Sequence, residues 1–215
     1  MKIIAVQKLL AANAQIAHEV RASLDRAGVY AINVLGAPGA GKTALLEALI
    51  PVLSQRLPVA VIEGDQATAR DAERIRALGV PVVQINTGQG CHLDARMVSA
   101  AVAELDLRAI RLLFIENVGN LICTAEFDLG EHLRLGVLSV PEGDDKIAKY
   151  PTMFSCLDAL ALNKTDLLPH LEFDVTRVAS ELRRLRRTTK VFRVSARSGA
   201  GIAALAKWLA ARAAR

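Results

Sequence analysis

The stretch from Gly36 to Thr43, Gly-Ala-Pro-Gly-Ala-Gly-Lys-Thr, has the residue types and spacing of a phosphate-binding loop between a strand and a helix. Glycines let the backbone curl so that successive N–H groups point at a polyphosphate, and the helix that follows adds partial positive charge. Lys42 can reach the β- and γ-phosphates, and the Thr43 hydroxyl can ligate Mg²⁺. We therefore predict that nucleotide phosphates are bound by Gly36, Gly39, Ala40, Gly41, Lys42 and Thr43.

Two acidic residues follow apolar runs that predict strands, Asp65 in Glu-Gly-Asp and Glu116 in Phe-Ile-Glu-Asn. Carboxylates at these places hold Mg²⁺ or orient an attacking water in phosphoryl transfer. We predict catalytic roles for Lys42, Asp65 and Glu116, with Thr43, Asp65 and Glu116 as the magnesium ligands. Asp65 would also suit a turn or a helix cap before Thr68. Gly119 can turn its N–H toward a γ-phosphate.

The motif Asn163-Lys164-Thr165-Asp166 follows another apolar run and predicts a guanine site. One carboxylate accepts both N1–H and the 2-amino group of guanine, and adenine would leave Asp166 unpaired. Asn163 is expected at the O6/N7 edge of the base and the Lys164 stem over the ring. Ser195 and Ala196, after the last predicted strand, supply a further loop against the base. We therefore expect GTP rather than ATP.

Two cysteines and a histidine form a second candidate constellation. Cys91 and His92 are adjacent at a predicted helix start, and Cys123 follows the strand that ends at Glu116. Loops that leave the carboxyl ends of nearby parallel strands lie close together, and two thiolates with one imidazole suit Zn²⁺ or Ni²⁺. The alternative is that both cysteines are buried small apolar residues, and the spacing alone does not choose between the two.

Alternating apolar and helical segments indicate the scaffold that holds these residues. Strands are expected at 31–35, 58–63, 81–85, 111–116, 134–140, 158–162 and 190–194, and helices at 43–55, 68–78, 92–105, 173–187 and 199–213. Strands that are apolar on both faces predict a mostly parallel sheet covered by helices on both sides. Ile4, Leu9, Ala12, Ile16, Val20 and Leu24 recur at helical spacing, so an amphipathic helix should precede the sheet. We expect one α/β domain over 1–215, with residues 1–28 as the packed N-terminal helix.

The composition excludes several classes of protein. The chain has 215 residues, 52% of them hydrophobic, and a net charge of +5. No apolar run reaches the ~20 residues of a membrane span, and the first residues lack the apolar core of a signal peptide. Three cysteines cannot all pair, which favours the reducing cytoplasm. The arginine-rich segment 183–187 lacks interleaved aromatic residues, so we expect a solvated helix and no nucleic acid or membrane partner.

With these residues in view, the chain resembles the hydrogenase nickel-incorporation GTPases, the HypB family. The resemblance covers nearly the whole chain. Its most specific stretch is Cys-His-Leu-Asp-Ala from Cys91, which in the urease accessory GTPases has a proline after the cysteine. The other matching stretches are Gly36–Thr43, Glu63–Asp65, Gln84–Gly88, Phe114–Leu121 with Cys123, Phe127–Glu131, Ser139–Lys146, Tyr150-Pro151 and Asn163–Asp166.

The resemblance implies a SIMIBI-type P-loop GTPase that forms a homodimer with GTP bound. It also implies a nickel or zinc site at Cys91, His92 and Cys123. The implied partners are a HypA-like nickel-binding accessory protein and the precursor of the hydrogenase large subunit. Many members begin with a cysteine-rich motif and a histidine-rich tract, and this sequence has neither, so we expect no metal site other than the one in the GTPase domain.

Overall fold

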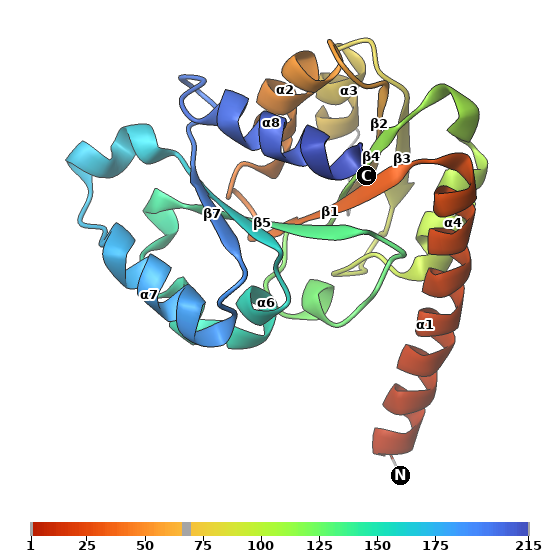
Figure 1. Ribbon diagram of the computed structural model, residues 1–215. Coiled ribbons are helices and arrows are strands. Elements are labelled where there is room, and N and C mark those ends of the chain that lie inside the picture. Colours follow the sequence, from red (N-terminus) through yellow and green to blue (C-terminus); the bar gives the residue numbers. More distant parts are fainter. Residues whose placement is uncertain (1, 66–69, 215) are drawn as a thin grey trace.

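Seven strands form one sheet in the computed structural model, which describes residues 2–65 and 70–214, with side chains from Lys8 onward. The strand order is β3-β2-β4-β1-β5-β6-β7, and all neighbouring strands run parallel (Figure 1). The predicted fold class is confirmed, and each strand lies within two residues of its expected range. The strands are β1 (Tyr30–Gly36), β2 (Val59–Asp65), β3 (Val82–Asn86), β4 (Leu112–Glu116), β5 (Leu133–Ser139), β6 (Ala159–Asn163) and β7 (Lys190–Arg193).

The helices also follow the predicted order, with two additions. They are α1 (Lys2–Ala27), α2 (Lys42–Leu53), α3 (Arg70–Arg76), α4 (Ala95–Ala103), α5 (Lys146–Lys149), α6 (Pro151–Ser155), α7 (Val175–Leu185) and α8 (Ile202–Ala213). The short helices α5 and α6 were not predicted. The predicted start of α3, residues 68 and 69, lies outside the described residues. Within the described chain, no helix combines the length and the apolar character that a bilayer crossing requires.

Helix α4 begins three residues later than the pattern predicts. The side chain of Asp94 caps it by accepting a hydrogen bond of 2.8 Å from the Met97 N–H. Cys91 and His92 therefore lie in a loop before the helix rather than in its first turn. This correction matters for the site, because loop residues can approach a neighbouring loop more closely than residues fixed in a helix.

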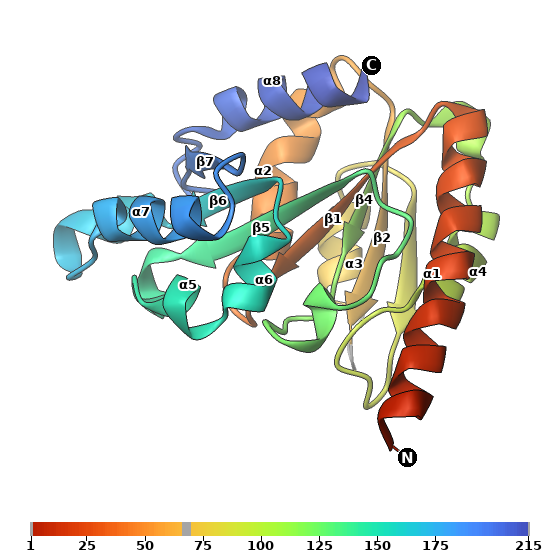
Figure 2. The ribbon, with the colours of Figure 1, turned by 60° about the horizontal axis from the view of Figure 1, so that its bottom comes forward.

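Apolar side chains cover both faces of the central strands. Ile32 and Phe114 join one cluster with α2 and α8, whereas Leu113 joins a second cluster with Leu24 of α1 and with α4. All four side chains are fully buried, and each contributes roughly 1.5–3 kcal/mol to folding. The sequence signal of two-sided apolar strands is thus explained by helices on both faces (Figure 2).

Helix α1 packs over only part of its length. Val20 and Leu24 are buried against α4 and the sheet, but Leu9 is 60% exposed and Ala12 is also exposed. A helix of 26 residues is about 39 Å long, and its N-terminal end extends beyond the sheet (Figures 1 and 2). The prediction of one continuous apolar face is therefore wrong for the first half of the helix. Ile4, which was also assigned to that face, lies outside the described side chains.

Candidate nucleotide and metal site

The loop between β1 and α2 encloses a cavity of about 350 Å³ at the carboxyl ends of β2 and β4. Gly41 precedes α2 with φ of 91°, a conformation that favours glycine. Lys42 and Thr43, the first residues of the helix, are nearly buried and face the cavity. Gly119 closes the other side, and a Cβ there would lie 2.8 Å from the Pro38 nitrogen. The cavity therefore has the backbone geometry, helix N-terminus and lysine that a polyphosphate requires.

Two predicted phosphate-binding residues support the loop instead of lining the cavity. The Gly36 carbonyl accepts a hydrogen bond of 3.1 Å from the Asn120 N–H, and a Cβ on Gly36 would lie 2.6 Å from the Val137 carbonyl oxygen. Ala40 is fully buried beneath the loop. The other predicted members, Gly39, Gly41, Lys42, Thr43 and Gly119, all line the cavity.

Buried carboxyl groups crowd the floor of this cavity. Glu116 accepts a hydrogen bond of 2.7 Å from the Thr43 hydroxyl, and Glu63 lies directly beside it on the neighbouring strand. Burial raises the pKa of Glu63 to about 8, helped by Glu116, Asp65 and Asp71. Burial also raises the pKa of Glu116 to about 7, opposed by Lys42 and Thr43.

This donor set fits Mg²⁺. Glu63 and Glu116 each have one buried carboxylate oxygen without a hydrogen-bond partner in the structure, and Asp65 lines the same cavity. A hard divalent cation prefers oxygen ligands, and its charge would favour the ionised form of both carboxyl groups. We predicted Thr43, Asp65 and Glu116 as ligands and missed Glu63. The alternation of side chains along β2 was the available signal, because Glu63 and Asp65 point to the same side of the strand.

A second cavity of about 210 Å³ adjoins the first at Gly41 and is lined by Asp166, Lys164 and Ala196. The Ser195 hydroxyl donates a hydrogen bond of 2.6 Å to Asp166 and lowers the pKa of that carboxyl. An ionised, oriented carboxylate at the wall of a small cavity can accept the paired donors of guanine. Ser195 itself is fully buried, so it positions Asp166 and does not face the base.

Asn163, which lines the second cavity, also joins three loops. Its amide nitrogen donates to the Ala40 carbonyl at 3.1 Å, and its amide oxygen accepts from the N–H groups of Lys164 and Ala196 at 2.8 and 3.2 Å. The expected contact of Asn163 with O6 or N7 of the base stays a prediction. The Lys164 ammonium donates to the Gly39 carbonyl at 2.7 Å, which ties the base site to the phosphate loop.

The two cysteines and the histidine converge, as the loop argument predicted. The ligand atoms of Cys91, His92 and Cys123 all lie within 4.8 Å of one another in one chain. Cys91 Sγ lies 3.5 Å from His92 Nδ1, and a hydrogen bond with Cys91 raises the pKa of Cys123. The His92 ring stacks on Phe127 with centroids 4.0 Å apart, which fixes the imidazole. Two thiolates and one imidazole at this spacing can bind a transition metal such as Zn²⁺ or Ni²⁺ and leave a coordination position open.

The segment 117–120 connects the two sites directly. On one side, Gly119 packs on Pro38 and the Asn120 N–H bonds to Gly36. On the other side, the Asn120 side chain accepts from the N–H groups of Ile122 and Cys123 at 2.6 and 3.0 Å. One residue thus contacts the phosphate loop and fixes the backbone that carries a thiol.

Two further contacts reach the loop that carries Cys91 and His92. The Asn117 side chain accepts a hydrogen bond of 3.2 Å from the Leu93 N–H. The Asp65 carbonyl accepts one of 2.9 Å from the Thr87 N–H, and the Thr87 hydroxyl donates at 2.9 Å to the carbonyl of Gly90, the residue before Cys91. The residues at the ends of β2 and β4, where the buried carboxyl groups lie, therefore contact the loop that carries Cys91 and His92.

The fold and the first cavity define a P-loop nucleotide-binding protein, and the comparisons with known proteins agree. The family model "CobW/HypB/UreG, nucleotide-binding domain" matches residues 30–193. The hydrogenase maturation factor HypB of Azotobacter vinelandii is 54% identical over 204 residues, which cover 95% of this chain and 66% of that protein. The hydrogenase/urease maturation factor HypB of Helicobacter hepaticus is 45% identical over 202 residues, which cover 92% of this chain and 83% of that protein. The crystal structure of HypB from Helicobacter pylori in complex with nickel superposes with a TM-score of 0.89 at 36% identity, covering 94% of each chain.

The chain belongs to the HypB family of hydrogenase maturation factors. It spans about two thirds of the length of the Azotobacter protein. The resemblance that the sequence indicated is thereby confirmed, as is the P-loop class of the fold.

Proposed function

We propose that the chain is a GTP-hydrolysing metallochaperone that carries nickel during the maturation of [NiFe]-hydrogenase. The observation that carries this proposal is the cluster of Cys91, His92 and Cys123, which adjoins the nucleotide cavity through the segment 117–120. Nickel is here a cargo, and the open coordination position suits release better than permanent storage. Zinc is the alternative occupant of the same ligands.

Nucleotide choice follows from the second cavity. Asp166 is ionised and oriented by Ser195. GTP satisfies both carboxylate oxygens, whereas ATP would leave a desolvated carboxylate unpaired. Mg²⁺, when bound by Thr43, Asp65 and Glu116 with Glu63 nearby, would neutralise phosphate charge. Lys42 stabilises the transferred phosphoryl group, and Asp65 orients the attacking water.

Hydrolysis by the isolated chain should be slow. Arg74 is the arginine that lines the cavity among the described residues, and it is held away from a phosphate by Glu47 at 2.6 Å and Asp71 at 2.7 Å. Without an arginine to stabilise the transition state, P-loop GTPases hydrolyse GTP slowly. A partner or a second subunit would accelerate the reaction.

The contacts through Asn117, Asn120 and Thr87 suggest how the two sites work together. GTP orders the segment 117–120, and the change reaches both metal-binding loops. We propose that two subunits close on each other with GTP bound, and that hydrolysis reopens the pair and releases the metal. The expected setting is the cytoplasm, with a HypA-like nickel-binding protein and the hydrogenase large-subunit precursor as partners. We further propose that residues 1–215 act as one domain.

A second candidate function is metal delivery to urease. The Helicobacter hepaticus relative is named a hydrogenase/urease maturation factor, so one chain of this family serves two enzymes. The chemistry at Cys91, His92 and Cys123 would be the same in both cases.

The experiment that tests the proposal measures Ni²⁺ stoichiometry and GTP hydrolysis together. The chain should bind one Ni²⁺ per subunit and hydrolyse GTP but not ATP. Substituting Cys91 and Cys123 by Ala should abolish stoichiometric metal binding and leave GTP affinity unchanged. If the double variant retains its metal, the chain is a GTPase with structural cysteines, and the proposal is wrong.

A further inference from the structure

Positive charge is distributed very unevenly along this chain. None of its 22 acidic residues lies beyond Glu181, whereas ten of its 27 lysines and arginines do. Residues 182–215 therefore carry a formal charge of +10, and residues 1–181 carry −5. The net charge of +5 conceals this separation, and a one-sided charge distribution is a property of surfaces that attract a charged partner.

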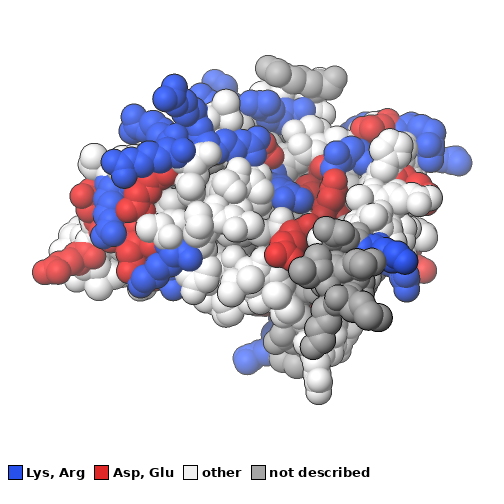
Figure 3. All heavy atoms as spheres, turned by 90° about the horizontal axis from the view of Figure 1, so that it is seen from below, with Lys and Arg blue, Asp and Glu red and all other residues white. Residues whose placement is uncertain are grey.

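Five of these cations are exposed on consecutive elements at the β7 edge of the sheet. They are exposed side chains on the last turn of α7, on the segment that follows it, and on the edge strand β7: Arg183, Arg184, Arg187, Lys190 and Arg193. In the view from below, Lys and Arg side chains gather on the side of the molecule where α7 lies (Figure 3). We call these five residues the cationic edge.

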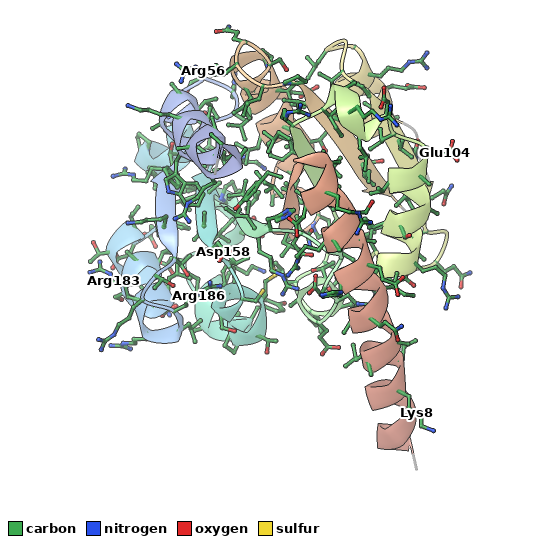
Figure 4. All side chains as sticks on the ribbon, turned by 45° about the vertical axis from the view of Figure 1, so that its right-hand side comes forward. Lys8, Arg56, Glu104, Asp158, Arg183 and Arg186 are labelled. Carbon is green, nitrogen blue, oxygen red and sulfur yellow. The ribbon has the colours of Figure 1, made fainter. Side chains whose placement is uncertain are left out.

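The cations of this surface have no acidic partner in the part of the chain that the structure describes. Arg186, which lies among them in the sequence, is paired with Asp158 at 2.7 Å and is excluded from the set for that reason. Figure 4 shows Arg186 near Asp158 and Arg183 at the outer edge of the same part of the molecule. Within the described residues, the five members form no ion pair. Arg183 and Arg184 lie in the last turn of α7, where the helix dipole favours cations, so their side chains are accommodated by the fold and remain exposed to a partner.

Apolar side chains within the cationic edge indicate what kind of partner it fits. Leu185 and Val191 are each 37% exposed, and they are two of the five large hydrophobic residues exposed in the described chain. The aromatic residue nearest in the sequence, Phe192, packs on Trp208 and is not free to stack on a base. Arginine is enriched at protein interfaces, which combine apolar contacts with a polar rim, whereas single-stranded nucleic acid binds on exposed aromatic platforms.

We propose that the cationic edge is a docking surface for an acidic segment of another protein, one that also carries aliphatic side chains. The partner's carboxylates would pair with the five cations, and its apolar side chains would cover Leu185 and Val191. This surface is separate from the residues assigned above to GTP, Mg²⁺ and nickel, so the proposal does not depend on the proposed function.

The test measures binding of the full chain to a short fluorescent peptide of Glu, Asp and Leu by anisotropy. The comparison ligands are a peptide with the same leucines and no net charge, a DNA duplex, a single-stranded RNA and vesicles of anionic lipid. The acidic peptide should bind best at matched salt, and its affinity should fall as salt rises from about 50 to about 200 mM. Tighter binding of the duplex, the RNA or the vesicles would overturn the assignment of a protein partner.

Matched variants locate the binding surface. Reversing Arg183, Arg184 and Arg187 to Glu should weaken peptide binding by about tenfold or more, the sum expected of three exposed ion pairs. The control reverses Arg26, Arg56 and Arg108, which are exposed elsewhere and make the same change in net charge. Equal losses in both variants would show a non-specific charge effect and refute the proposal. GTP affinity verifies that each variant is folded, and neutral Gln variants at the same three positions replace any charge-reversed variant that fails this check.

Discussion

The most informative single substitution is Asn120→Ala, because Asn120 contacts both sites. Its backbone N–H bonds to the Gly36 carbonyl of the phosphate loop, and its side-chain oxygen holds the N–H groups of Ile122 and Cys123. Alanine keeps the backbone contact and removes the side-chain contacts. The substitution should therefore separate the two sites without removing any ligand from either.

The expected size of the effect follows from the two lost hydrogen bonds. Each contributes about 0.5–1.5 kcal/mol net, so ordering of the loop at Cys123 loses about 1–3 kcal/mol. Couplings between sites are typically of the same size and change affinity about 5- to 150-fold. We therefore expect the ratio of Ni²⁺ affinities in the GDP-bound and GTP-analogue-bound states to fall to nearly one. GTP affinity should change little.

The assay is a Ni²⁺ titration with each nucleotide for wild type, Asn120→Ala and two companion variants. Asn120→Asp retains the accepting oxygen and should restore most of the ratio. Asn86→Ala is the control, since the exposed Asn86 side chain makes a similar loop contact, to the Gly88 N–H at 2.9 Å, but has no hydrogen bond to the phosphate loop. A wild-type affinity ratio in Asn120→Ala would refute the reasoning.

Three further predictions address the individual sites. Cys91→Ala and Cys123→Ala should each lower Ni²⁺ affinity by at least about tenfold, as measured by equilibrium dialysis. Cys156 lies outside the cluster, so Cys156→Ala should leave the affinity unchanged. Glu116→Gln should raise the Tm of the nucleotide-free chain, because burial of the ionised carboxylate is unfavourable and the amide carries no charge. The rise should be roughly 2–4 °C for each kcal/mol gained, and a lowered Tm would contradict the prediction. The same variant should abolish the Mg²⁺ dependence of GTP binding. Gly64→Ala places a Cβ 2.9 Å from Leu93, next to His92, and should alter both the stability of the chain and its Ni²⁺ affinity. Gly136→Ala, whose Cβ meets Leu157, is the control and should lower only the stability. The overpacking cost is about 1–3 kcal/mol of unfolding free energy, measured by thermal unfolding.

The strands and the ligand cluster could be predicted from the sequence because each depends on a short-range pattern. Runs that are apolar on both faces, such as Leu112–Ile115, have no stable place except a covered sheet. Once the sheet is parallel, the loops after successive strands meet at one edge, and Cys123 must lie near the loop that carries Cys91 and His92. The same argument placed Asp65 and Glu116 beside the phosphate loop.

The roles of the asparagines could not be predicted, because each joins its own loop to a segment that is distant in the sequence. Asn163 was assigned to the base, and its additional bond to the Ala40 carbonyl was not foreseen. Asn117 and Asn120 were not singled out, although they bond to the loops that carry Cys91 and Cys123. Asn13 of α1 similarly accepts from the Ala95 N–H at the start of α4. Amide side chains satisfy whichever backbone groups the fold brings to them. The start of α4 was also missed, although its signal is local: Asp94 caps the helix by accepting from the Met97 N–H, three residues further on.

The central claim is that one chain couples a guanine nucleotide to a nickel site built from Cys91, His92 and Cys123. The most direct measurement is the Ni²⁺ dissociation constant of the unmodified chain, by competition with a chelator, in GDP and in a non-hydrolysable GTP analogue with Mg²⁺. Our account predicts dissociation constants that differ by at least about fivefold. Equal dissociation constants and equal stoichiometry in the two states would contradict it.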